Sequence, residues 1–204
     1  MSDNERLTDL LGGYAYCAVA ALALLDAANP DSSAAPDHYI RAGIPSQPSL
    51  IHFLANRQFA YLGSGEDDED SANHPLPDLS SLSVSNDVPV AAGFNGRLNK
   101  LPDTCYAWWN AGALALLGEG DLIDRSSARR FILEKTQHLV GGFAKYPGGP
   151  PDVYHAYMGL AALGTMAGND SEPGLAKFDS RLCISADAAA RMAKAREALL
   201  KTFV

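Results

Sequence analysis

A segment of about ten residues recurs three times in this chain, and this recurrence constrains the fold more than any other feature. The copies are Gly13-Tyr-Ala-Tyr-Cys-Ala-Val-Ala-Ala-Leu, Cys105-Tyr-Ala-Trp-Trp-Asn-Ala-Gly-Ala-Leu and Tyr154-His-Ala-Tyr-Met-Gly-Leu-Ala-Ala-Leu. The last two copies begin 49 positions apart, a spacing typical of helical-hairpin repeats. Alanine and leucine, which dominate all three, are strong helix formers. We therefore expect a stack of helical hairpins.

The residues before the second and third copies repeat as well. A glycine-phenylalanine pair stands at Gly93-Phe94 and again at Gly142-Phe143, each phenylalanine 12 positions before Tyr106 or His155. Chance similarity between alanine-rich helices is the alternative, but equal offsets favour a true repeat. The repeating unit is a helix, a glycine-rich loop and a second helix.

Strand signals are scarce, and the predicted fold is all-α. Small residues are spread around each expected helix, which indicates burial on several sides rather than one amphipathic stripe. The expected helices span residues 13–28, 48–61, 103–118, 126–139, 152–167 and 185–202.

The first loop is about 30 residues longer than its counterpart. The excess, residues 63–92, is acidic, rich in Ser and Pro and poor in large apolar residues. Such a composition predicts a disordered surface insertion. A partner-binding role is an alternative, but a tolerated insertion is the favoured interpretation.

Composition excludes several classes of protein. The chain has 204 residues, 47% of them hydrophobic, which is enough for one packed core. A net charge of −8 argues against broad nucleic-acid binding. Residues 12–28 come nearest to a membrane span, but Tyr14, Tyr16, Cys17 and Asp26 interrupt them, so a buried core helix is expected. We do not expect a membrane protein.

Three cysteines do not form a disulfide framework, and we expect no signal peptide at the polar N-terminus. A reducing, cytoplasmic setting is therefore expected.

Three side chains suggest a metal site. Asp103 follows Pro102 at a natural helix N-cap, and Cys105 lies in the first turn after it. His155 falls one position past the counterpart of Cys105 in the next repeat. If equivalent helices are neighbours, one carboxylate, one thiolate and one imidazole meet. Three protein ligands leave a fourth position open, as in catalytic zinc sites.

A possible anion site lies beside these ligands. Arg97 and Lys100 stand in the glycine-rich loop before the same helix, and Tyr106 follows Cys105. Two cations and a phenol near a helix N-terminus can hold a phosphate-like anion. A solvated basic loop is the alternative. An aromatic surface close by, which core packing explains equally well, comprises Trp108, Trp109, Tyr154 and Tyr157.

The longest informative stretch is Gly93-Phe-Asn-Gly-Arg-Leu-Asn-Lys-Leu-Pro-Asp-Thr-Cys-Tyr-Ala-Trp-Trp109. It resembles the signature of protein prenyltransferase β subunits. Asp152-Val-Tyr-His155 resembles the zinc-histidine motif of that family, and Gly12-Gly-Tyr-Ala-Tyr-Cys17 the start of an earlier barrel helix. The resemblance covers residues 12–166 and implies an α/α toroid, with residues 12–204 forming a part of it.

By this resemblance, Asp103, Cys105 and His155 would bind zinc and carry catalysis. Arg97, Lys100 and Tyr106 would bind the isoprenoid diphosphate, and Tyr14 and Trp109 would line the lipid pocket.

Two features depart from the family pattern. Leu11 replaces a histidine that contacts the diphosphate in the family. The N-terminal repeats, roughly half of a normal β subunit, are not found, so the toroid is expected to be incomplete at its N-terminus.

Within the family, Asp103-Thr-Cys-Tyr and Leu139-Val-Gly-Gly-Phe-Ala-Lys145 are most similar to the type I geranylgeranyl enzyme. In farnesyltransferases an aspartate that binds magnesium would stand where Lys145 stands. Lysine has no acceptor for a metal, so Lys145 would instead face the diphosphate, and Mg²⁺ would not be required.

The implied reaction transfers a geranylgeranyl group from geranylgeranyl diphosphate to the thiol of a C-terminal Cys-a-a-X motif, in substrates such as small GTPases. Zinc is the implied cofactor and a prenyltransferase α subunit the implied partner in a heterodimer. A farnesyltransferase β subunit is the nearest alternative, before the Rab-directed enzyme. A truncated, non-catalytic fragment that at most binds the α subunit is another. A terpene-cyclase-like toroid is disfavoured because it does not need the Asp-x-Cys and His set.

Overall fold

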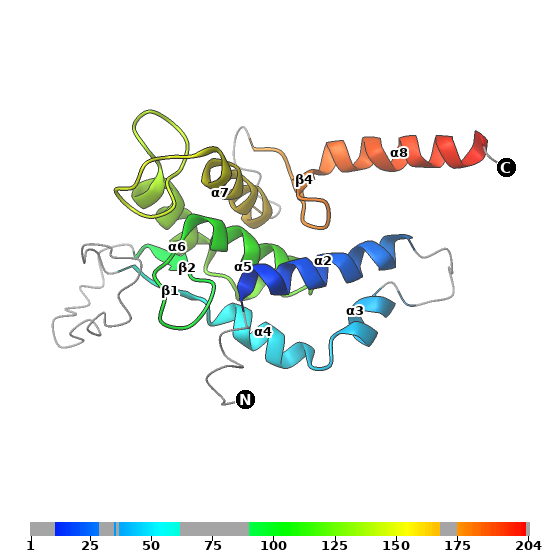
Figure 1. The fold of residues 1–204 in the computed structure, drawn as a ribbon, viewed down its shortest axis with the longest axis horizontal. Helices are drawn as coiled ribbons and strands as arrows, with labels where there is room; N and C mark the ends of the chain where they lie inside the picture. Colours follow the sequence, from blue (N-terminus) through cyan, green and yellow to red (C-terminus); the bar gives the residue numbers. More distant parts are fainter. Residues whose placement is uncertain (1–10, 29–34, 36, 62–89, 168–174, 203–204) are drawn as a thin grey trace.

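A computed structural model describes residues 11–28, 35, 37–61, 90–167 and 175–202 (Figure 1). The three repeated segments form the helices α2 (Gly12–Ala28), α5 (Thr104–Leu116) and α7 (Val153–Met166). α5 packs against both α2 and α7. α5 and α7 begin 49 positions apart, as the repeat predicted. The predicted all-α fold built from helical hairpins is confirmed.

Shorter helices surround these three. α3 packs against α2, and α4 packs against α5. The predicted helix 126–139 is divided into α6 and a π-helical continuation, η3, that ends at Thr136. The bounds of the shorter elements are α3 (His38–Gly43), α4 (Gln47–Ala55), the 3-10 turn η2 (Gly120–Leu122), α6 (Arg125–Arg130) and η3 (Phe131–Thr136). A longer helix, α8 (Ala186–Thr202), ends the described chain.

The predicted helix 48–61 is wrong at its C-terminal end. α4 stops at Ala55, and β1 (Gln58–Ala60) follows, antiparallel to β2 (Ala92–Phe94). The backbone of Gln58 lies opposite Phe94, and its side-chain amide bonds the backbone of Asp124 in both directions. Partners distant in the sequence therefore override the local helical pattern.

The predicted insertion 63–92 falls mostly outside the described residues. Its last residues form part of the core instead, because Ala91 and Ala92 are buried and Ala92 begins β2. A second short hairpin pairs β3 (Phe178–Asp179) with β4 (Ile184–Ser185).

The core lies where α5 meets its neighbours. Trp108, Leu114, Phe94 and Phe131 are fully buried. Burying each such side chain contributes about 1.5–3 kcal/mol. Among the small residues, Gly112 matters because a Cβ there would lie 3.0 Å from the ring of Tyr16. This close approach lets α2 pack tightly against α5.

α8 extends away from the other helices toward the C-terminus (Figure 1). All of its described residues from Ala190 onward are exposed. Across the described part of the chain, no helix is both long and apolar enough to cross a bilayer.

Candidate metal centre

The first half of the site is the start of α5. Asp103 is the N-cap, with an extended backbone at φ −139° and ψ 136°. Its Oδ1 accepts a hydrogen bond from the backbone N–H of Cys105 at 2.8 Å. This local bond is the ordinary reason for an aspartate at an N-cap. It also places the Asp103 carboxylate beside the Cys105 thiol at the positive end of the helix dipole.

The second half is the start of α7, where Asp152 is the N-cap. Asp152 Oδ1 accepts from the backbone N–H of His155 at 2.8 Å, and Asp152 Oδ2 lies 2.6 Å from His155 Nδ1. The imidazole is thus held by a carboxylate through Nδ1. This leaves Nε2 as the nitrogen that faces the rest of the site, 3.3 Å from Asp103 Oδ1.

One ligand atom from each of Asp103, Cys105 and His155 lies within 4.8 Å of the others. In a tetrahedral zinc site with bonds of about 2.0–2.3 Å, ligand atoms are about 3.5 Å apart. The 3.3 Å between Asp103 Oδ1 and His155 Nε2 already matches this spacing. The His155 and Asp103 side chains are only 11% and 12% exposed, so the donors are shielded but reachable. A carboxylate holding the second histidine nitrogen is typical of zinc ligands. The donor set therefore fits the predicted metal.

Protonation in the absence of metal follows from the same contacts. Burial raises the pKa of the Cys105 thiol, and the Asp103 carboxylate raises it further. Burial lowers the pKa of His155, but its bonds with Asp103 and Asp152 outweigh that effect and leave this pKa above its usual range. Both shifts favour the protonated forms, and a bound metal would displace those protons.

The predicted diphosphate residues gather around the start of α5. Arg97 and Lys100 lie in the loop before it, Arg97 half-buried and Lys100 exposed. Tyr106 packs over Gly96, where any Cβ would overlap the ring at 2.1 Å. Burial raises the pKa of Tyr106 to about 12, and Arg97 acts against that rise. The phenol therefore keeps its proton and can donate a hydrogen bond to an anion.

Lys145 reaches the same place from the other repeat. Its carbonyl accepts from the backbone N–H of Thr104 at 2.9 Å, so its backbone lies at the first residue of α5. The sequence placed Lys145 in the second glycine-rich loop. The structure brings that loop against the residue between Asp103 and Cys105.

Aromatic side chains flank the three donors. Trp109 Nε1 donates to the Tyr154 hydroxyl at 3.2 Å, and the Trp109 ring lies 5.1 Å from that of Tyr16. Tyr14 is 69% exposed on α2, whose next residue toward the N-terminus, Gly13, faces the Trp109 ring. The two predicted lipid-contacting residues, Tyr14 and Trp109, therefore lie on adjacent helices.

Two residues of the site were not predicted as functional. Asp152 was quoted only as part of a motif, although an aspartate three residues before a candidate histidine ligand is a usable signal. Thr104 gave no signal, because its partners lie in a loop about 40 residues away.

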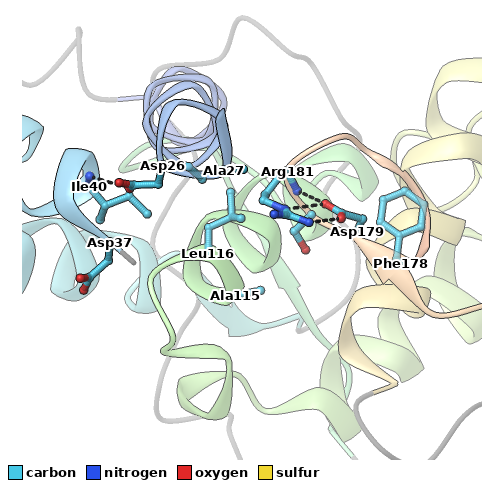
Figure 2. Close-up of a pocket in the computed structure, with 11 residues that line it drawn as sticks. Asp26, Ala27, Asp37, Ile40, Ala115, Leu116, Phe178, Asp179 and Arg181 are labelled. Atoms are coloured by element: carbon cyan, nitrogen blue, oxygen red, sulfur yellow. Dashed lines mark hydrogen bonds and ion pairs between the residues drawn. The ribbon is translucent and has the colours of Figure 1, made fainter. Parts of the chain in front are cut away.

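An open hollow of about 610 Å³ lies away from this site, between α2, α3, the end of α5 and the β3 hairpin (Figure 2). Its charged side chains already have partners. Asp26 accepts hydrogen bonds from the backbone N–H groups of Tyr39 and Ile40. Figure 2 shows the bond to Ile40 and the ion pair of Asp179 with Arg181. The hollow therefore supplies no unpaired group for chemistry.

Comparison with known proteins gives consistent matches. The family described as "Prenyltransferase alpha-alpha toroid domain" matches residues 5–184. The β subunits of geranylgeranyl transferase type-1 from Arabidopsis thaliana and Dictyostelium discoideum are each 48% identical to this chain over 71 residues. Those alignments cover 35% of this chain and 19% and 20% of the relatives. A type-2 β subunit from Saccharomyces cerevisiae is 38% identical over 81 residues, which are 40% of this chain and 25% of the relative.

Among solved structures, Candida albicans protein geranylgeranyltransferase-I complexed with GGPP matches with a TM-score of 0.62 and 27% identity. The match covers 88% of this chain and 42% of that chain. The matched region therefore spans less than half the length of each of these relatives.

Proposed function

Because this chain belongs to the prenyltransferase α/α toroid family, we propose that it acts as the catalytic β subunit of a protein geranylgeranyltransferase type I. In this role it transfers a geranylgeranyl group from geranylgeranyl diphosphate to the cysteine thiol of a C-terminal Cys-a-a-X motif. The observation that carries the proposal is the meeting of Asp103, Cys105 and His155 within 4.8 Å, at a helix start whose neighbouring loops contain basic residues.

The three donors would hold zinc, which, when bound, lowers the pKa of an incoming thiol and so supplies a thiolate at neutral pH. Asp152 keeps His155 Nδ1 occupied and directs Nε2 toward the metal position. The protein ligands leave one coordination position for the substrate sulfur.

The basic residues would act on the other reactant. Arg97, Lys100 and Tyr106 would offset the negative charge that grows on the diphosphate as it leaves. The rings of Tyr14, Trp109 and Tyr154 give the isoprenoid an apolar surface beside the reacting carbon. Excluding water there strengthens each charge interaction.

A direct test uses the chain assembled with a prenyltransferase α subunit. Geranylgeranyl and farnesyl diphosphate compete for one Cys-a-a-X peptide, and the products are counted by mass. The proposal expects mainly geranylgeranylated peptide. A farnesylated majority would make the chain a farnesyltransferase subunit, and the absence of both products would contradict catalysis.

Lys145 distinguishes a type I geranylgeranyltransferase from a farnesyltransferase. If its ammonium serves the diphosphate, the assembled enzyme turns over with zinc alone. Lys145→Asp should then lower the rate without magnesium, by about tenfold or more, and added magnesium should restore part of it, because a carboxylate can bind Mg²⁺. Steady-state rates with and without magnesium provide the measurement. Lys135→Asp, an equal charge change at an exposed residue of η3, is the control.

Dependence of the unmodified enzyme on millimolar magnesium would contradict the role given to Lys145 and favour a farnesyltransferase.

A non-catalytic role for the isolated chain is the second candidate, and one face of α2 favours it. This face consists of exposed apolar or small side chains at helical spacing, without a charged residue among them: Tyr14, Cys17, Ala18, Ala21, Leu24, Leu25 and Ala28. Large exposed apolar patches promote association. We therefore expect the isolated chain to self-associate and to be inactive, and size-exclusion chromatography with a prenylation assay checks this. A stable, active monomer would be the contrary result.

A further inference from the structure

Thr104 lies between two candidate metal ligands and is completely buried. Its hydroxyl donates to the carbonyl of Ala144 at 2.7 Å, and its backbone N–H donates to the carbonyl of Lys145 at 2.9 Å. Both donors of this one residue therefore go to consecutive carbonyls of the second glycine-rich loop. A buried hydroxyl with a short bond of this kind is costly to remove, because its partner is left unsatisfied.

The same loop is anchored to α7 on its other side. The Phe143 ring packs on Gly159, where a Cβ would lie 2.7 Å away, and the Phe143 carbonyl accepts from Asp152 N at 3.4 Å. Thr104 thus joins the start of α5, which carries Asp103 and Cys105, to a loop already fixed on the helix that carries His155.

Glycines border this loop. Gly142 has φ +76° and Gly148 has φ +82°, a region that favours glycine. Residues 143–147 lie between these two glycines, whose backbone can adopt many conformations. Contacts of residues 143–147 with the rest of the protein must therefore fix the position of the loop. Ala144 N bonds the carbonyl of Thr136, and the Thr104 hydroxyl holds the carbonyl of the same residue, Ala144.

We propose that Thr104 is a positioning residue, whose hydroxyl holds the loop carrying Lys145 against the start of α5 and so sets the place of the Lys145 charge beside the metal and the diphosphate. The assignment of diphosphate as the anion rests on the proposed function. The inference that Thr104 holds the loop does not rest on the proposed function, because it follows from the two hydrogen bonds of Thr104 to the carbonyls of Ala144 and Lys145.

Thr104→Val removes the hydroxyl but keeps the β-branched shape, and Thr104→Ser keeps the hydroxyl. Thr136→Val is the matched control, because Thr136 is equally buried and its hydroxyl donates to the Ile132 carbonyl at 3.0 Å within its own helix. All are made in the full chain. If Thr104 had only a structural role, Thr104→Val and Thr136→Val should have the same effect.

The first readout is amide hydrogen exchange of residues 142–148. Thr104→Val should speed exchange there about tenfold, the effect of one lost net hydrogen bond, while residues 106–116 of α5 stay protected. Thr104→Ser and Thr136→Val should leave the loop near its unmodified rate. Unchanged loop exchange in Thr104→Val, or an equal rise in Thr136→Val, would overturn the proposal.

The second readout is the affinity of the zinc-loaded chain, assembled with a prenyltransferase α subunit, for inorganic diphosphate, measured by calorimetry. Thr104→Val should weaken binding about tenfold when Lys145 is present and change it little in a Lys145→Met background, because the effect passes through Lys145. Equal weakening in both backgrounds, or none, would overturn the positioning role. If the unmodified assembled enzyme does not bind diphosphate, the proposed function fails, and loop exchange alone decides whether Thr104 holds the loop.

Discussion

Asp103 and Asp152 stand at the same position of two successive repeats, yet they do different work. Each is the N-cap of its helix and accepts a backbone hydrogen bond at 2.8 Å. Asp103 is 12% exposed and faces His155 Nε2, whereas Asp152 is 49% exposed and holds His155 Nδ1. In the proposed zinc site, Asp103 would bind the metal and Asp152 would orient the ligand His155.

Asp103 and Asp152 differ in their contacts because the candidate ligands after them stand at different distances from the N-cap. Cys105 follows its cap by two residues, and His155 follows its cap by three. The longer imidazole at the third position returns to its own cap through Nδ1 while its far nitrogen reaches the neighbouring repeat. Two repeats with the same backbone structure therefore form an asymmetric site, because the candidate ligand stands one position later in the second repeat than in the first.

The largest expected effect comes from removing a ligand. Cys105→Ser and His155→Ala should each lose nearly all bound zinc, because the remaining protein ligands bind it too weakly. Elemental analysis should find about one zinc per unmodified chain. Cys17→Ser, an equal change at an exposed cysteine, should retain the metal. Full zinc in both ligand variants would place the site elsewhere.

Matched substitutions at the two caps separate their roles. Asparagine caps helices as well as aspartate, so Asp103→Asn and Asp152→Asn leave both helices capped. Asp152→Asn should weaken zinc binding about 10-fold, within the range for a partner that only supports a ligand. Asp103→Asn should weaken it more, since a charged ligand is lost. Chelator competition gives both affinities, and the reverse order would contradict the division of roles.

Zinc affinity should rise with pH. Below the pKa of His155, which lies above 6.5, zinc must displace protons from both His155 and Cys105, so affinity should rise about a hundredfold per pH unit. Above that pKa, only the Cys105 thiol still releases a proton, and the slope should fall to about tenfold per unit.

Asp152→Asn removes one of the interactions that raise the His155 pKa, so it should move this change of slope to lower pH. Chelator competition from pH 6 upward follows the slope. If the slope changes at the same pH in Asp152→Asn as in the unmodified protein, Asp152 does not raise the pKa of His155.

The smallest effect is expected at a third cap, outside the site. Asp124 caps α6 and accepts from the Ser127 backbone at 3.0 Å and the Ser127 hydroxyl at 2.6 Å. Asp124→Ala should lower the free energy of unfolding by about 1 kcal/mol and leave zinc content unchanged. Denaturant unfolding and elemental analysis test both parts. Loss of zinc here would show that metal retention reports general stability rather than the two caps of the site.

Local chemistry let the sequence predict the helix starts and the candidate ligands. An aspartate after a proline marks a helix N-terminus, and the equal spacing of the repeats aligns Cys105 with the start of the next repeated helix. These signals depend only on neighbours in the chain and on the 49-residue period. The same reasoning failed after Ala55, where β1 pairs with residues more than 30 positions later.

By itself, the sequence determined the repeat, the family and the three candidate donors, because each depends on residue types at fixed spacings. Only the tertiary structure decided which histidine nitrogen faces Asp103, since that depends on Asp152 Oδ2 lying 2.6 Å from Nδ1. It also decided that Thr104 holds the loop of Lys145, through a bond to a carbonyl 40 residues away. Hydrogen bonds between distant segments form when helices pack, and a one-dimensional pattern carries no information about their direction.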